Sequence, residues 1–319
     1  MNVLEMIENT GILPVINITD IDTAIPLAES LTDCGIQAME ITLRNEKSLD
    51  ALSLIKKEYP KMGILAGTVL SVEQAEQAIN SGTDGIVMPG YDDEIIDYAI
   101  KNNIPVVPGC VTAADIQKGI KKGLKLFKFF PAEQSGGIAA LKLLSGPFKE
   151  VKFLPTGGIN FDNLSTYLNN DFIFACGGSY MADAKTLKEK NFNKIKENCK
   201  KAVDISLNFK LAHIGINNDS DAEAYGTAEA ISSVFGFNVR KCSNSTFAGD
   251  AVECMNNRRF GEKGHIGIST NSIKRAMAYL SARGIEFDES SIKRDGDNNI
   301  SCIYLKKQIN GFALHIVKN

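Results

Sequence analysis

The run KLFKFFPAE, from Lys125 to Glu133, decides the interpretation of the fold because it sets a lysine among aromatic residues in a short β-prone segment. Burying an unpaired ammonium costs several kcal/mol. Lys128 therefore needs either a route to solvent at a strand end or a polar partner inside a pocket. Which of the two applies depends on what the rest of the chain builds around this strand.

Apolar or β-branched runs recur at fairly even spacing along the first two thirds of the 319-residue chain. Helix-period segments separate them, and SVEQAEQAINSG opens with a serine cap followed by glutamine three residues later. Eight strand-then-helix units in about 200 residues favour a (β/α)₈ TIM barrel over an open doubly wound sheet, and so an α/β fold. The eight runs cover residues 12–18, 38–44, 63–69, 85–90, 105–110, 126–133, 152–158 and 172–179.

Composition limits the classes of partner. A formal charge of −3 gives no basic footprint for nucleic acid, and no apolar run approaches the length of a membrane span. The N-terminus is acidic before its apolar part and lacks the basic region of a signal peptide. Seven cysteines without a C-x-x-C pair are typical of reduced thiols that pack as small core hydrophobes. We expect a cytoplasmic protein without nucleic-acid or membrane partners.

Polar residues collect where several predicted strands end. Strand alternation places Glu40 on one face with Thr42 and Arg44, and barrel chemistry gathers at the C-terminal ends of the strands. One pocket would then hold Lys128, Glu40 and Arg44 together with several hydroxyl groups. The hydroxyl groups belong to Thr68, Thr156 and Ser179. In the alternative arrangement, Lys128 reaches solvent at the strand end and Glu40 pairs structurally with Arg44.

A lysine in a dry pocket has a specific chemical use. Desolvation lowers the pKa of an amine from its usual value of about 10.4, so that free amine can attack a ketone and form a Schiff base. The iminium accepts electrons as a neighbouring carbon–carbon bond breaks, and a glutamate beside it can shuttle protons. Arginine can hold the carboxylate of a 2-oxo acid. These are the parts of a class I aldolase.

The motifs ILPVI, MEITLR, AGTVL, MPG, IPVVPG, FKFFPAE, PTGGI and GGSY occur in this order. Over about residues 1–205 they closely resemble the 2-dehydro-3-deoxy-phosphogluconate / 4-hydroxy-2-oxoglutarate aldolase family. The resemblance implies reversible cleavage of a 4-hydroxy-2-oxo acid to pyruvate and an aldehyde. It implies no cofactor, because a lysine of the protein forms the Schiff base. It also implies a homotrimer.

Carried over to this sequence, the resemblance implies that Lys128 forms the Schiff base with pyruvate and that Glu40 is the proton shuttle. The residues that it places around the substrate are Arg44, Thr68, Pro89, Phe130 and Thr156. The alternative for this unit is a phosphate-ligand-binding barrel protein, or an isomerase, that works without a covalent intermediate.

Two glycine pairs, PTGG (155–158) and CGGS (176–179), end the seventh and eighth predicted strands. Barrels of this kind often bind phosphate there through backbone N–H groups, and glycine lets the backbone come close to the anion. Each pair alone is also explained by a tight turn. Together they predict a phosphate pocket made by Gly157, Gly158, Gly178 and Ser179. Tyr180 departs from the family pattern, which commonly has tryptophan after GGS.

The pattern changes near Phe209, so we expect domains at 1–208 and 209–319. HIGIN begins at 213 and HIGIS at 265, each followed by a helix ending in glycine and then by strand-like runs, which indicates two βαβββ modules. All three histidines of the chain lie here. His213 and His265 occupy matching positions, with the adjacent isoleucines expected to face the helices. His315 and Glu253 lie in the two closing strands.

Three imidazoles and a carboxylate at repeat-related positions suit a divalent transition metal, although a lone strand histidine is more often structural. Residues 211–319 resemble the vicinal oxygen chelate superfamily, which includes glyoxalases and extradiol dioxygenases. This resemblance implies His213, Glu253, His265 and His315 as metal ligands. Glyoxalase-like members more often have a carboxylate where this chain has His315. The reaction of this domain therefore stays open.

Overall fold

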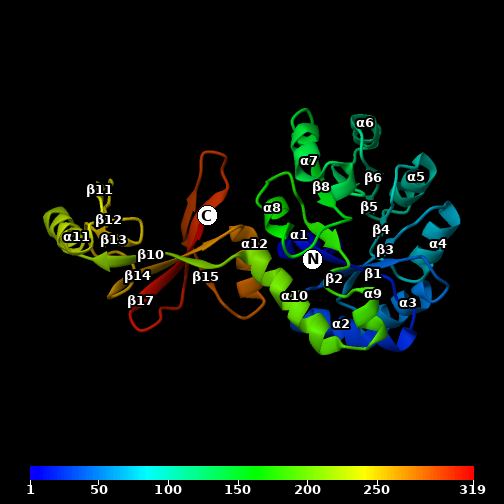
Figure 1. The fold of residues 1–319 in the computed structure, drawn as a ribbon, viewed down its shortest axis with the longest axis horizontal. Coiled ribbons are helices and arrows are strands. Elements are labelled where there is room, and N and C mark those ends of the chain that lie inside the picture. The colour runs from blue at the N-terminus through cyan, green and yellow to red at the C-terminus, as the bar shows by residue number, and fades with distance from the viewer. The chain divides into compact units, whose positions relative to one another are not determined.

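The computed structural model describes all residues 1–319 and divides into two compact units, Met1–Ser206 and Leu207–Asn319. Figure 1 shows the first unit from blue to green and the second from yellow-green to red. Helix α10 (Phe192–Leu207) crosses the boundary after Ser206, which lies two residues before the one expected from the sequence. No helix in either unit combines the length and the apolarity that a membrane span requires.

Parallel strands close the first unit into a barrel. Two sheets have the orders β5-β4-β3-β2-β1-β9 and β6-β7-β8, and single bridges from Phe153 to Ile173 and from Thr156 to Gly177 join β8 to the last strand. The predicted (β/α)₈ barrel is confirmed for this unit. The strands are β1 (Ile12–Ile16), β2 (Ala38–Thr42), β3 (Gly63–Gly67), β4 (Gly85–Val87), β5 (Val106–Val107), β6 (Gly109–Cys110), β7 (Leu126–Phe129), β8 (Lys152–Pro155) and β9 (Cys176–Gly178).

Two of the eight predicted runs are less regular than expected. The fifth splits into β5 and β6 around Pro108, which has no N–H to give to a neighbouring strand. Its carbonyl oxygen still accepts a hydrogen bond from the backbone N–H of Lys128, at 2.9 Å. The eighth run, expected over 172–179, forms a regular strand only at β9, and upstream of it pairs through the isolated bridge at Ile173.

Helices follow most strands and cover the barrel. Ser71 caps α4 as predicted, since its Oγ accepts the N–H of Gln74 at 3.2 Å. The glutamine side chain accepts from the N–H of Leu70 instead of that of Ser71. The helices are α1 (Val3–Thr10), α2 (Ala24–Asp33), α3 (Ser48–Glu58), α4 (Val72–Asn80), α5 (Asp93–Lys101), α6 (Ala113–Lys121), α7 (Gly137–Ser145), α8 (Leu164–Leu168) and α9 (Ala184–Lys188), with single 3₁₀ turns at Ile21–Thr23 and Glu133–Ser135.

Helix α1 fills the end of the barrel opposite to the strand C-termini. Its residues Val3 and Ile7 join the buried cluster that contains Leu13, Leu65 and Leu154 from three barrel strands. Apolar burial at this end leaves the opposite end of the barrel for polar side chains.

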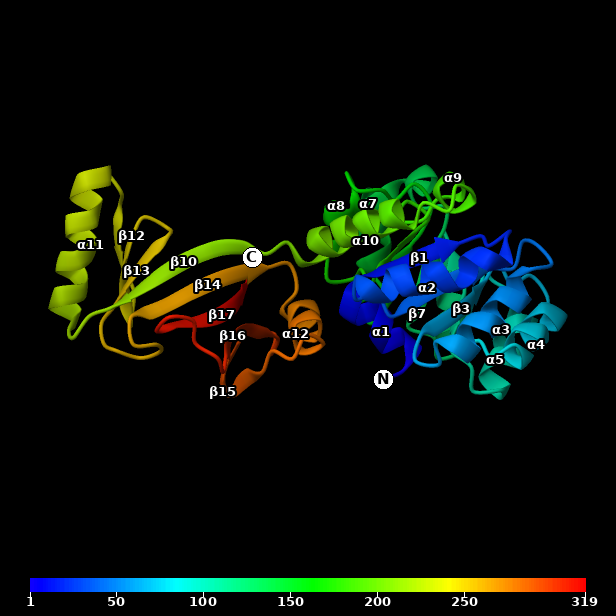
Figure 2. The same ribbon diagram turned by 90° about the horizontal axis from the view of Figure 1, so that it is seen from below.

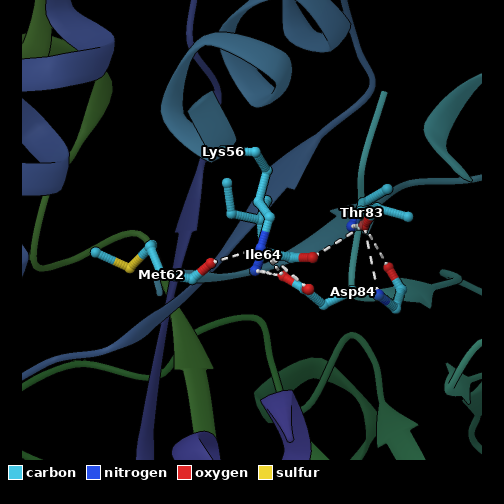
Figure 3. Close-up of polar contacts among 7 residues, drawn as sticks. Lys56, Met62, Ile64, Thr83 and Asp84 are labelled. Carbon is cyan, nitrogen blue, oxygen red and sulfur yellow. Dashed lines mark hydrogen bonds and ion pairs between the residues drawn. The ribbon is translucent and has the colours of Figure 1, made fainter. Parts of the chain in front are cut away.

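A polar network ties α3 to the segment before β4 (Figure 3). The ammonium of Lys56 donates to the carboxylate of Asp84 at 2.9 Å and to the carbonyl of Met62 at 3.1 Å. The same carboxylate accepts the N–H of Ile64 at 2.8 Å. Buried Thr83 accepts the N–H of Ala66 at 3.0 Å. These contacts satisfy backbone groups of β3 that would otherwise lack a partner.

The second unit forms one eight-stranded sheet from two copies of the same βαβββ order (Figure 2), as the repeat predicted. The strand order is β11-β12-β13-β10-β14-β17-β16-β15. The first copy contains β10 (Lys210–Asn217), α11 (Asp221–Phe235), β11 (Val239–Lys241), β12 (Ser245–Ala248) and β13 (Val252–Met255). The second copy contains β14 (Gly264–Thr270), α12 (Ile273–Ser281), β15 (Phe287–Arg294), β16 (Ile300–Leu305) and β17 (Phe312–Lys318).

One expectation for this sheet is wrong in part. The isoleucines beside the repeated histidines were expected beneath the helices, but Ile214 is 39% exposed. Helix α11 packs through Ala224 and Ala228 on Ala248 and Cys254, which belong to β12 and β13. Helix α11 therefore lies over β12 and β13. It does not cover Ile214, which lies on β10 near the centre of the eight-stranded sheet.

We expect Thr83→Val to lower the free energy of unfolding by about 1–3 kcal/mol, because the N–H of Ala66 would stay buried without a partner. Urea unfolding of the full chain, followed by far-UV circular dichroism, measures the change. Ser53→Ala is the matched control, since it removes an exposed hydroxyl that also contacts a backbone carbonyl. Equal stability of the Thr83→Val variant and the wild type would contradict this account.

Candidate functional site

Lys128 on β7 and Glu40 on β2 meet inside the barrel. The ammonium Nζ lies 2.9 Å and 3.2 Å from the two carboxylate oxygens, and the side chains are 6% and 0% exposed. The alternative in which Lys128 reaches solvent while Glu40 pairs with Arg44 is therefore wrong. The attraction between the ammonium and the carboxylate offsets the free energy that each charge loses on leaving water.

Neighbouring residues shape the space for this pair. A Cβ on Gly67 would lie 2.2 Å from a carboxylate oxygen of Glu40, so only glycine on β3 lets the glutamate occupy this position. On the other side, the ammonium lies 5.5 Å from the ring centroid of Phe130. Lys128 is thus enclosed by one carboxylate and one aromatic face.

A cavity of about 310 Å³ opens at the C-terminal ends of the strands, and its wall contains Thr42 and Phe130, each two residues beyond a member of the pair, but neither Glu40 nor Lys128. Three of the predicted substrate residues line it, namely Arg44, Phe130 and Thr156. The Thr156 hydroxyl is buried and has no hydrogen-bond partner in the protein. A buried hydroxyl without a partner is costly unless a ligand or water supplies one.

Thr68 and Pro89, also predicted to contact substrate, follow β3 and β4 and do not line this cavity. Thr68 has φ = 59°, a left-handed conformation that costs a β-branched residue of the order of 1–3 kcal/mol. A Cβ on Gly109 would lie 2.1 Å from the carbonyl oxygen of Pro89, so that segment packs directly on β6. Both residues lie at the rim where the site is built, in tightly constrained backbone.

The four residues predicted to bind phosphate come together in the wall of the cavity. They are Gly157, Gly158, Gly178 and Ser179. The first two have φ of 98° and 81°, which only glycine adopts without strain. A Cβ on Gly178 would lie 2.6 Å from the ring of Tyr180, whose hydroxyl is buried without a partner. Burial raises the pKa of Tyr180, so the phenol stays neutral.

The cavity wall contains an asparagine that was missed in the sequence. Asn17 follows β1 and lines the cavity, and its Oδ1 accepts a hydrogen bond from the Asn45 amide at 2.9 Å. Its position directly after the first strand, at the rim where barrel chemistry collects, was a usable signal.

In the second unit, the four predicted metal ligands meet on four adjacent strands. The ligand atoms of His213, His265 and His315 lie within 4.8 Å of one another. Carboxylate oxygen Oε2 of Glu253 lies 3.1 Å from Nε2 of His265 and 3.5 Å from Nε2 of His213. The Nε2 atoms of His213 and His315 are 3.0 Å apart.

The repeated His-x-Gly spacing explains why these rings fit together. Antiparallel pairing of β10 and β14 sets His213 opposite Gly267 and His265 opposite Gly215. A Cβ on Gly215 would lie 2.0 Å from the His265 ring, and one on Gly267 would lie 2.6 Å from the His213 ring. Each copy therefore provides one histidine and the empty space for the histidine of the other copy.

The charges of three members of this cluster follow from their surroundings. Burial lowers the pKa of His315 to about 3 and also lowers that of His213, so both imidazoles are neutral at pH 7. Burial raises the pKa of Glu253, but hydrogen bonds from His265 and Ser245 outweigh it and hold the pKa at about 2. An ionised carboxylate beside neutral imidazoles is a donor set that fits a divalent transition metal.

Residues 3–198 match the family model described as KDPG and KHG aldolase. The KHG/KDPG aldolase of Escherichia coli strain K12 is 37% identical over 201 residues, which are 63% of this chain and 94% of that protein. The 2-dehydro-3-deoxy-phosphogluconate aldolase of Treponema pallidum is 35% identical over 195 residues, which are 61% of this chain and 93% of that protein. These matches concern the barrel unit.

Solved structures give the same result. A KDPG aldolase of Legionella pneumophila, with pyruvate captured as a covalent carbinolamine intermediate, has a TM-score of 0.62 and 35% identity, over 63% of this chain and 98% of that one. A 2-keto-3-deoxy-6-phosphogluconate aldolase of Zymomonas mobilis, with 3-phosphoglycerate, has a TM-score of 0.60 and 36% identity, over 63% of this chain and 94% of that one.

We expect Lys128→Met to lower the free energy of unfolding by about 3–5 kcal/mol, because it leaves the carboxylate of Glu40 buried without its counter-ion. The double variant Lys128→Met/Glu40→Leu should regain most of this loss, since neither charge remains. Urea unfolding of the two single variants, the double variant and the wild type gives the coupling free energy.

The matched control for this cycle is the exposed pair Lys125–Glu150, whose side chains are 72% and 84% exposed. Its coupling free energy should be about 0–1 kcal/mol. A buried pair no more strongly coupled than this surface pair would show that desolvation is not the dominant effect.

Proposed function

Because the chain belongs to the KDPG and KHG aldolase family, whose members are lyases, we propose that Lys128 of its barrel forms the Schiff base of a class I aldolase. The reaction is the reversible cleavage of a 4-hydroxy-2-oxo acid to pyruvate and an aldehyde. The observation that carries the proposal is the buried contact between Lys128 and Glu40, because Phe130 and Thr42, which follow them two residues further along the chain, line the cavity.

In this mechanism the free amine of Lys128 attacks the ketone carbon, and loss of water from the carbinolamine gives an iminium. A base removes the proton of the C4 hydroxyl, the C3–C4 bond breaks, and its electrons pass to the iminium, releasing the aldehyde. Protonation of the resulting enamine at C3 and hydrolysis then release pyruvate and the amine. The 2.9 Å contact with Nζ supports Glu40 as the group that moves protons in these steps.

Cavity residues suggest how the substrate is held. Arg44 can bind the carboxylate through two parallel hydrogen bonds, and the partnerless hydroxyl of Thr156 can reach a substrate oxygen. Phe130 packs beside the reacting carbon, while Thr68 and Pro89 hold the rim. Glycine-rich backbone at Gly157, Gly158, Gly178 and Ser179 favours a phosphorylated sugar acid, such as 2-dehydro-3-deoxy-6-phosphogluconate, alongside 4-hydroxy-2-oxoglutarate. The homotrimer implied by the resemblance stays a prediction.

Incubation with pyruvate and borohydride should attach one reduced pyruvate to Lys128, because borohydride reduces the iminium to a stable secondary amine. Peptide mapping by mass spectrometry locates the adduct. The Lys128→Met variant should give no adduct and lose aldol cleavage, whereas Lys125→Met, which removes an exposed lysine of the same strand region, should react like the wild type. Aldol cleavage retained by Lys128→Met would favour the non-covalent alternative.

For the second unit, we propose a vicinal oxygen chelate fold with a divalent transition metal held by His213, Glu253, His265 and His315. The support is the meeting of four ligand atoms on the strands that the repeat relates. A bound metal would act there as a Lewis acid toward an oxygen of a ligand. His315, in place of the carboxylate more common in glyoxalase-like members, argues against assigning their isomerase reaction.

We expect the full chain to bind one equivalent of Zn²⁺, Mn²⁺, Fe²⁺ or Ni²⁺ when each is supplied in turn, as measured by elemental analysis after desalting. His213→Ala and His265→Ala should each lower the bound fraction at least tenfold, since each removes one ligand of the proposed set. Ile214→Ala changes the neighbouring residue on the opposite face and should bind like the wild type. The proposed site would be excluded if the purified full chain bound none of the four metals stoichiometrically.

A further inference from the structure

Two of the four ligands in the second unit have a partner on the side away from the cluster centre. The Ser245 hydroxyl donates to Oε1 of Glu253 at 2.7 Å, which leaves Oε2 directed at the histidines. The Cys302 sulfur lies 3.1 Å from Nδ1 of His315, which leaves Nε2 directed at His213. Both partners are buried, at 3% and 6% exposure.

The sheet register places Cys302 where it can hold the ring. Tyr304 on β16 pairs with His315 on β17, and the two rings stack with centroids 4.6 Å apart at 12°. Cys302 lies two residues before Tyr304, so its side chain leaves the same face of the sheet. The phenol thus fixes the plane of the imidazole while the thiol contacts its outer nitrogen.

Metal binding imposes a condition on the protons of this cluster. In the structure Nε2 of His265 lies 3.1 Å from Oε2 of Glu253, so a hydrogen bond between them requires a proton on this nitrogen. The Nε2 atoms of His213 and His315 lie 3.0 Å apart, so a hydrogen bond between them requires a proton on one of the two. A metal needs the lone pair of every Nε2. Each imidazole then keeps its single proton on Nδ1 instead.

We propose that Cys302 and Ser245 are positioning residues of the metal centre, with the thiol holding the outer nitrogen of His315 and the hydroxyl holding the outer oxygen of Glu253. This inference rests on the metal site proposed above. A thiol can donate to Nδ1 when the proton is on Nε2, and it can accept from Nδ1–H when Nε2 binds a metal. A carboxylate could only accept, and so would fix one tautomer before a metal arrives.

The chain offers an unusually clear spectroscopic test, because its only three histidines are all in this cluster. Full-length protein labelled with ¹⁵N-histidine gives six ring nitrogens, and their shifts and couplings report which nitrogen is protonated and which binds Zn²⁺. In the wild type we expect Zn²⁺ on Nε2 of His315 and a proton on its Nδ1.

Affinities for Zn²⁺ and Co²⁺, from competition with a chelating dye, give the second readout. Cys302→Ala and Ser245→Ala should each weaken binding about 10- to 100-fold, the usual effect of removing an outer partner of a ligand. Cys302→Ser keeps a group that donates and accepts, and should recover most of the affinity. Cys254→Ala is the control, since it removes a buried sulfur beside Glu253 that packs instead against α11.

Several outcomes would overturn the inference. Zn²⁺ bound through Nδ1 of His315 in the wild type would do so even if every variant failed to fold. Wild-type affinity and unchanged ¹⁵N signals in Cys302→Ala would also overturn the inference, but they would not contradict the proposed metal site. A wild-type chain that binds none of Zn²⁺, Mn²⁺, Fe²⁺, Ni²⁺ and Co²⁺ would overturn both proposals together.

Discussion

The ion pair of Lys128 and Glu40 is the interaction on which the chemistry of the barrel depends. Either charge alone would be strongly destabilising, because leaving one partner of a buried ion pair costs about 3–5 kcal/mol, a large share of the stability of a typical protein. Strands β7 and β2 must therefore be brought together by a closed barrel, and β3 must carry glycine at position 67 to leave room for the glutamate. Closure of the sheet and placement of the reactive amine are thus one structural requirement.

The sequence allowed the barrel and the meeting of Lys128 with Glu40 to be predicted because both depend on strong local signals. Strand alternation correctly placed Lys128 and Glu40 on inner faces, and the order of eight runs gave the topology. Local signals could not show that Pro108 divides the fifth strand, since a proline is tolerated wherever its neighbours supply the missing contacts. The strained φ of Thr68 was equally hidden, because tertiary contacts impose it against the preference of the residue.

In the second unit, the repeat predicted which residues meet but not what surrounds them. The spacing of HIGIN and HIGIS correctly brought His213 and His265 together, because antiparallel strands with the same motif pair each histidine with a glycine. The contact of Cys302 with His315 had no sequence signal, since the two residues belong to separate strands and a cysteine is usually only a small apolar side chain. The exposure of Ile214 depends on where α11 docks, which strand periodicity does not specify.

The pairing of the two copies places Glu253 opposite Gly215 and His315 opposite Gly267, so these two residues are equivalent under the local twofold relation of the sheet. Two identical single-copy chains joined by a true twofold axis would have to carry the same side chain at both places. Such a dimer could offer only four imidazoles or two carboxylates with two imidazoles. Joining the copies in one polypeptide removes that restriction, and the centre can hold a single negative charge that no symmetric assembly of half-sites could produce.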